Sequence, residues 1–145
     1  MAKKVSKYPS WATASGPVRA GQEAYLVQGV FVGMDSAGSV TPADYRKSAG
    51  PIPALGFVIA DVQHKDVLGN VIVNDKQVAW AKEGKIAGFS GLTIGATYYM
   101  TSGGLVTLRP AWGIGQVAGD IEQAVGTAVS ATELEVLISG PVPKV

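Results

Sequence analysis

The sequence lacks cysteine and contains a single histidine among its 145 residues. The absence of cysteine excludes disulfides, thiol nucleophiles and metal centres with cysteine ligands. His64 lies in a polar stretch beside a predicted turn, which is typical of a solvated surface residue. Glu133 and Glu135 alternate on a predicted strand and share a face, which we interpret as a solvent-facing edge. We therefore expect a protein that is not an enzyme and uses no metal or cofactor.

Charge and long apolar runs are also scarce. The 12 basic residues nearly balance the 11 acidic ones, and the net charge of +1 excludes a strong positive field for nucleic acid. No apolar run approaches the roughly 20 residues that cross a bilayer, and no apolar signal-peptide segment follows the N-terminal lysines. We expect no membrane partner, no nucleic-acid partner, and synthesis in the cytoplasm.

Apolar residues, glycine and proline are abundant instead. Hydrophobic residues make up 47% of the chain, which excludes a disordered body, and 19 glycines and 8 prolines interrupt any long helix. Short apolar runs separated by turn residues are typical of a β-sandwich or barrel. We expect an all-β fold whose body is a small barrel or sandwich, with hairpins from residues 24–32 with 40–41, 98–101 with 105–108, and 125–129 with 134–138.

The N-terminal segment differs from the rest of the chain in charge and pattern. It contains no acidic residue before Glu23, and its prolines and glycines leave neither a helical nor a strand period. We therefore predict an extended N-terminal arm over residues 1–21 and a single β-rich domain over residues 22–145. An extended arm of this length reaches beyond the edge of its own domain and can bind a neighbouring molecule.

Two aromatic rings of this arm are favoured anchors for a partner's pocket, because the segment has no core of its own to bury them. The basic side chains beside them complement an acidic protein surface. We predict that the arm binds a partner through Lys3, Lys4, Lys7, Tyr8, Trp11 and Arg19. The alternative is a terminal tail whose aromatic rings fold back onto the body.

Two parts of the body share the same order of sequence features. After Tyr25, a glycine turn leads to a short run ending at Pro42 and then to an Ala-Leu-Gly run at residues 54–58. After Tyr98, another glycine turn leads to a short run and then to an Ala-Val-Gly run at residues 124–129. We predict a pseudo-repeat in which two such units share one core, with chance similarity between two hairpins as the alternative.

The low content of charged residues, 16%, indicates association. A small apolar domain with so few charges is expected to cover part of its surface with copies of itself or with another protein. Closed cyclic symmetry is the usual arrangement of such copies.

Four segments carry a resemblance to a known family: GQEAYL at 21–26, ALGFV at 54–58, GLTIGATYYM at 91–100, and QAVGTAVSATEL at 123–134. In these segments the chain resembles the capsid decoration, or cement, proteins of tailed phages. The segment from Gly91 onward is the most specific of the four. The stretch Gln63 to Lys85 departs from a minimal member of the family because it is longer and more polar, and we expect an exposed loop or hairpin there.

The resemblance implies a non-enzymatic structural protein of the bacteriophage virion. Its partner would be the major capsid protein on the outer surface of the icosahedral head, and it would be a homo-oligomer, commonly a homotrimer at three-fold positions. It would stabilise the viral capsid by bridging capsid subunits, after synthesis in the host cytoplasm.

Two other functions stay open at this point. A receptor- or carbohydrate-binding module of a phage tail or fibre would stack sugars on exposed rings, for which Trp80, Trp112, Tyr98 and Tyr99 are the candidates. An enzyme would have to rely on His64, which leaves too few reactive groups.

Overall fold

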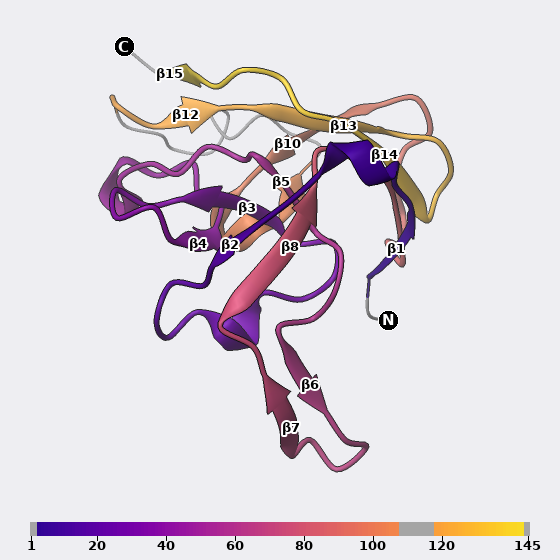
Figure 1. Ribbon diagram of the computed structural model, residues 1–145. Coiled ribbons are helices and arrows are strands. Elements are labelled where there is room, and N and C mark those ends of the chain that lie inside the picture. Colours follow the sequence, from indigo (N-terminus) through magenta and orange to yellow (C-terminus); the bar gives the residue numbers. More distant parts are fainter. Residues whose placement is uncertain (1–2, 108–117, 144–145) are drawn as a thin grey trace.

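The computed structural model describes residues 3–107 and 118–143 (Figure 1). The predicted all-β fold is confirmed: the described residues form short strands, one sheet curls into a half-barrel, and the helical segments are single turns. These 3-10 turns are η1 (Ser10–Ala12), η2 (Glu23–Tyr25), η3 (Lys47–Ala49) and η4 (Ser102–Gly104).

Two antiparallel sheets make up most of the molecule. The six-stranded sheet has the order β1 (Lys4–Lys7), β9 (Glu83–Ala87), β14 (Glu133–Leu137), β13 (Ala124–Ala128), β10 (Thr97–Met100) and β11 (Val106–Thr107). The five-stranded sheet has the order β2 (Thr13–Pro17), β8 (Gln77–Ala81), β5 (Gly56–Val58), β3 (Phe31–Met34) and β4 (Val40–Pro42). Two smaller pairs are β6 (Gln63–Lys65) with β7 (Val71–Asn74) and β12 (Ile121–Glu122) with β15 (Val142–Pro143).

The order of strands repeats between the two large sheets. In one sheet the hairpin β3–β4 lies beside β5, and β8 follows. In the other sheet the hairpin β10–β11 lies beside β13, and β14 follows. The two units of the predicted pseudo-repeat therefore have the same topology, and each one belongs to its own sheet.

The main core lies between the two large sheets. Phe31 and Phe57 face it from the five-stranded sheet, and their rings meet edge to face with centroids 6.3 Å apart. The six-stranded sheet contributes the alternating buried positions of its strands, among them Ile86, Met100 and Leu134. Strand side chains point alternately to opposite faces, so this sheet turns one apolar face inward and a polar face outward.

The five-stranded sheet is covered on both faces. Its second face presents Val32, Val58 and Trp80 to a smaller core, which the segment around Leu26 and Val30 closes. This explains why the run at residues 24–32 begins with η2 rather than with the predicted strand: its first apolar residues cover the sheet instead of pairing within it.

A buried amide ties the loop before β5 to the strands of the other sheet. The Gln123 side chain, 2% exposed, accepts a hydrogen bond from the Ala54 amide at 2.7 Å. Its nitrogen donates to the carbonyl oxygens of Ala54 at 3.0 Å and Ser139 at 2.9 Å. Since a buried polar group without a partner costs about 1–3 kcal/mol, this arrangement fixes the position of the loop against β13.

The chain crosses from one sheet to the other between β8 and β9, through Lys82 alone. The N-terminal segment follows the same crossing as an antiparallel neighbour: β2 pairs with β8, and β1 pairs with β9. At the corner, the Lys82 amide donates to the Ala12 carbonyl oxygen at 2.9 Å. The same pair of chains thus closes one end of both sheets, in the way that strands switch sheets at the corners of a sandwich.

This result changes the boundary predicted at residue 21. Residues 4–17 are extended as predicted, but they are edge strands of both sheets and not an arm outside the body. Val5 packs against the main core and Ala14 against the smaller one. The charge and glycine pattern did not reveal these strands, because each is an edge strand that pairs with only one neighbouring strand.

The stretch Gln63 to Lys85 contains the predicted exposed hairpin. Strands β6 and β7 project away from the body (Figure 1), and all four residues of β7 are exposed. At the tip, the Asp66 carboxylate accepts hydrogen bonds from the Leu68 and Asn70 amides, both at 2.9 Å. The Asn70 amide and side chain, with the Leu68 and Gly69 amides, lower the pKa of Asp66. The hairpin is inserted between β5 and β8, where the second unit has only the tight turn between β13 and β14.

The crossing yields a stability prediction at Gly84, which has a φ of +146°. A Cβ there would collide with the Lys7 carbonyl oxygen and lie 3.0 Å from the Phe57 ring. We expect Gly84→Ala to lower the free energy of unfolding by roughly 3–4 kcal/mol in urea titrations.

Gly91→Ala is the matched control, because Gly91 also has a positive φ, +70°, but has nothing within 4 Å of its Cβ position. This variant should lose only about 1 kcal/mol. Equal losses in the two variants would show that the close approach of β1 to β9 is not a constraint.

Candidate interaction surface

The N-terminal segment bulges outward where it crosses between the sheets. The paired positions Lys7↔Lys85 and Thr13↔Ala81 leave residues 8–12 on the N-terminal chain opposite residues 82–84 on the other chain. The outer chain therefore has five residues where the inner chain has three. The two extra residues are accommodated by η1, whose amide at Ala12 donates to the Pro9 carbonyl oxygen at 3.1 Å.

This bulge presents two aromatic rings to solvent. Trp11 is 75% exposed and Tyr8 is 42% exposed, while Ala12 between the rings and β2 is buried. Two shallow grooves include residues of the bulge: one of about 540 Å³ is lined by Lys7, Pro9 and Leu137 among others, and one of about 520 Å³ by Tyr8 and Ile59 among others. A large ring held in this position is suited to insertion into another protein's surface.

The predicted basic residues of the arm do not all have the same surroundings in the structure. Lys4 and Lys7 are exposed on β1, directly before the bulge. Lys3 is half-buried, with its ammonium nitrogen 4.9 Å from the centre of the Phe89 ring. The predicted residues that are exposed together on one segment are Lys4, Lys7, Tyr8 and Trp11. We call these four residues the crossover surface.

Arg19 lies apart from the crossover surface. Arg19 is six positions after Thr13 along an extended segment, a distance of roughly 20 Å at ~3.3 Å per residue. Its guanidinium is 3.6 Å from the Asp35 carboxylate, at the tip of the β3–β4 hairpin. Arg19 therefore belongs to a different face of the molecule.

Sequence reasoning missed Leu137, an exposed apolar residue of the groove beside Lys7. Leu137 is 72% exposed at the end of β14, on the outward face that Glu135 also shares. The signal was present, because Leu137 stands two residues after Glu135 and strand side chains alternate between faces. The shared face of Glu133 and Glu135 is confirmed, but the predicted edge is wrong, because β14 pairs with β13 on one side and with β9 on the other. Lys85 lies opposite Glu135 with its ammonium 4.0 Å from Glu133.

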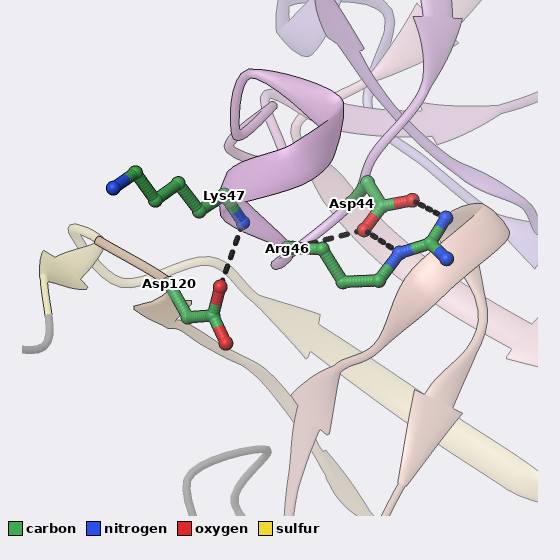
Figure 2. Close-up of polar contacts among 4 residues, drawn as sticks. All are labelled: Asp44, Arg46, Lys47 and Asp120. Carbon is green, nitrogen blue, oxygen red and sulfur yellow. Dashed lines mark hydrogen bonds and ion pairs between the residues drawn. The ribbon is translucent and has the colours of Figure 1, made fainter. Parts of the chain in front are cut away.

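A second polar cluster holds the loop that follows β4 (Figure 2). The buried Asp44 carboxylate accepts hydrogen bonds from the Arg46 amide and from two guanidinium nitrogens, at 2.9, 3.0 and 2.7 Å. The side-chain hydrogen bond and then the charge of Asp44 raise the pKa of Arg46. The buried Asp120 carboxylate accepts from the Lys47 amide at 2.7 Å. These carboxylates are committed to holding the loop, so we assign the cluster a structural role.

The rings considered for sugar stacking are mostly inside the protein. Trp80 is 4% exposed in the smaller core, and Tyr98 is 6% exposed, with its hydroxyl accepting from the Thr93 amide at 2.9 Å. Tyr99 is half-buried, and Trp112 lies outside the described residues. Neither Trp80 nor Tyr98 is available to a glycan.

His64 lies on β6 of the exposed hairpin, 3.7 Å from the Asp75 carboxylate. In residues 3–107 and 118–143, no three or more His, Asp or Glu side chains are grouped to hold a metal ion. The same ranges contain no helix long and apolar enough to span a membrane.

Comparison with known protein families gave no match, and neither did comparison with curated protein sequences.

Because Trp11 is largely exposed, we predict that removing its ring leaves the free energy of unfolding nearly unchanged. We expect Trp11→Ala to change the free energy of unfolding by less than about 0.5 kcal/mol, because the ring has little protein around it. Trp80→Ala is the contrasting variant, and it should lose roughly 3–5 kcal/mol. Chemical unfolding followed by circular dichroism measures both; a loss above about 1.5 kcal/mol in Trp11→Ala would mean that the ring packs on the body.

Proposed function

We propose that this chain is a structural protein of a tailed-phage virion that binds the outer surface of the head and stabilises it by bridging subunits of the major capsid protein. The resemblance in four sequence segments motivates this proposal. The observation that supports it best is Trp11, a ring that is three-quarters exposed although the strands on both sides of it are paired.

The way Trp11 is held favours binding. Two paired strands and the hydrogen bond from Lys82 to Ala12 keep the bulge in place, so little conformational entropy is lost when a partner covers it. Full burial of such a ring is worth about 2 kcal/mol or more. Many copies on one shell, each spanning two capsid subunits, add avidity to modest single contacts.

The two exposed lysines add electrostatic complementarity. Lys4 and Lys7 extend the crossover surface along β1, and we propose that they face acidic side chains of the major capsid protein. Charges at the rim of an interface act mainly on the association rate and are screened by salt. Lys3 is half-buried with its ammonium over the Phe89 ring, and Arg19 lies beside Asp35 away from the crossover surface, so the proposal does not include them.

The family resemblance also implies a homo-oligomer, with a trimer at the three-fold positions of the head. We keep the trimer as part of the proposal. Its closed symmetry would set three crossover surfaces around one axis, each directed at a different capsid subunit.

The proposal is tested by binding of the purified protein to heads assembled without it. Point variants are preferable to deletion of the first 20 residues, because deletion would remove edge strands of both sheets. We expect Trp11→Ala to weaken binding by roughly 30-fold, the effect of losing an anchor worth about 2 kcal/mol. Lys4→Glu with Lys7→Glu should weaken binding most at low salt.

Tyr25→Ala is the matched control. Tyr25 is also an exposed aromatic residue, at 62%, but it lies on η2 and lines a cleft with Arg19. The control should bind heads as the unaltered protein does. Unchanged affinity of Trp11→Ala would remove the crossover surface from head binding, and absence of any binding by the unaltered protein would refute the proposed function.

A further inference from the structure

The β6–β7 hairpin exposes a large apolar surface to solvent. Five aliphatic residues of its tip and of β7 are exposed: Val67, Leu68, Val71, Ile72 and Val73. A two-stranded hairpin without further packing is marginally stable, and three or more strands are needed for independent stability. This hairpin projects from the body (Figure 1), and within residues 3–107 and 118–143 no third strand pairs with it.

The two edges of the hairpin differ in character. Strand β6 carries Gln63, His64 and Lys65, and a polar or lysine-bearing edge is a common protection against pairing. Strand β7 has the sequence Val-Ile-Val-Asn, without charge, proline or glycine. The more open edge is therefore that of β7, whose composition favours pairing with another strand. Its pairing with β6 shifts register between Val73 and Val71, so Ile72 stands between the paired positions.

The sequence of β7 fits a second copy of itself. Around Ile72 the strand reads the same in both directions, since Val71 precedes it and Val73 follows it. In an antiparallel pair centred on Ile72, Val71 of each copy would oppose Val73 of the other. This reciprocity is what a two-fold interface requires, and residues 67–74 contain no charge that would repel its own copy.

The exposed apolar area reaches the range of specific interfaces only when the tip residues Val67 and Leu68 are covered together with β7. The five side chains expose on the order of 350 Å² of apolar surface per copy, taking roughly 100 Å² for a fully exposed aliphatic side chain. Interfaces are a little over half apolar, so this corresponds to about 1,200 Å² for two copies, at the lower end of the range for specific interfaces.

We propose that β7 pairs antiparallel with β7 of a second copy of this chain, about a two-fold axis at Ile72, to form a four-stranded sheet β6–β7–β7–β6. This contact goes beyond the proposed head binding, because it lies on a different element from the crossover surface. It is also distinct from a three-fold contact, and it would join two oligomers rather than close one.

The first test is the mass of the full-length protein by sedimentation velocity. We expect Ile72→Lys to weaken association through the hairpin by roughly 30-fold or more and to lower the mass at least twofold at concentrations where the unaltered protein is associated. Ile72→Thr, which keeps a β-branched side chain, should show a smaller effect with an unchanged circular dichroism spectrum. Leu137→Lys, an exposed position on β14, should keep the mass of the unaltered protein.

The second test measures the register, and the absence of cysteine from the chain makes it simple. Directly opposed residues of an antiparallel pair have Cα atoms about 4.5–5.5 Å apart, within the range of a disulfide. Ile72→Cys should therefore form a disulfide-linked dimer under mild oxidation, and a mixture of Val71→Cys with Val73→Cys should link across copies. Leu137→Cys should not link.

The proposal is overturned if Ile72→Lys has the same mass as the unaltered protein, or if Ile72→Cys links no better than Leu137→Cys. It is also overturned if the hairpin variants lose head binding while the unaltered protein is monomeric, since the hairpin would then bind the capsid. These results are separable from head binding through the crossover surface, because Trp11→Ala should keep the mass of the unaltered protein.

Discussion

The crossing of the chain at Lys82 is the constraint on which the rest of the structure depends. One residue separates β8 in the five-stranded sheet from β9 in the six-stranded sheet, so the two sheets are held at a fixed corner. Gly84 makes this corner possible, since a side chain there would meet the Lys7 carbonyl oxygen. The N-terminal strands follow the corner, and the longer path of the outer chain forces η1 and Trp11 outward.

The same corner relates stability to the proposed function. Residues 13–17 and 4–7 are needed to complete the two sheets, while the residues between them are free to carry a side chain that the fold does not use. A partner that covers Trp11 therefore binds the protein without competing with its core. This separation of the exposed ring from the core is consistent with the proposed binding to another protein. The Asp44 and Asp120 carboxylates hold the loop after β4 in place.

The sequence predicted the elements that local patterns specify and missed those that depend on distant partners. The hairpins β10–β11 and β13–β14 were predicted because alternation and turn residues lie within a few positions of each other. The exposed hairpin in the stretch Gln63 to Lys85 was predicted from its polarity. Strands β1 and β2 were missed as strands because their partners, β9 and β8, lie sixty or more residues away. Within the candidate site, Tyr8 and Trp11 were identified by chemistry, but no local signal separates Arg19 from them.

The placement of the first strands also has a consequence for synthesis. Lys4 pairs with Ala87, so β1 leaves the ribosome 83 residues before its neighbour does. At about 5–20 residues per second, β1 waits roughly 4–17 seconds for its partner strand. The five-stranded sheet cannot be completed until β8 has emerged, and the six-stranded sheet needs both β9 and β14. Folding is therefore dominated by long-range contacts, which slows it and prolongs the time during which strand edges are unpaired.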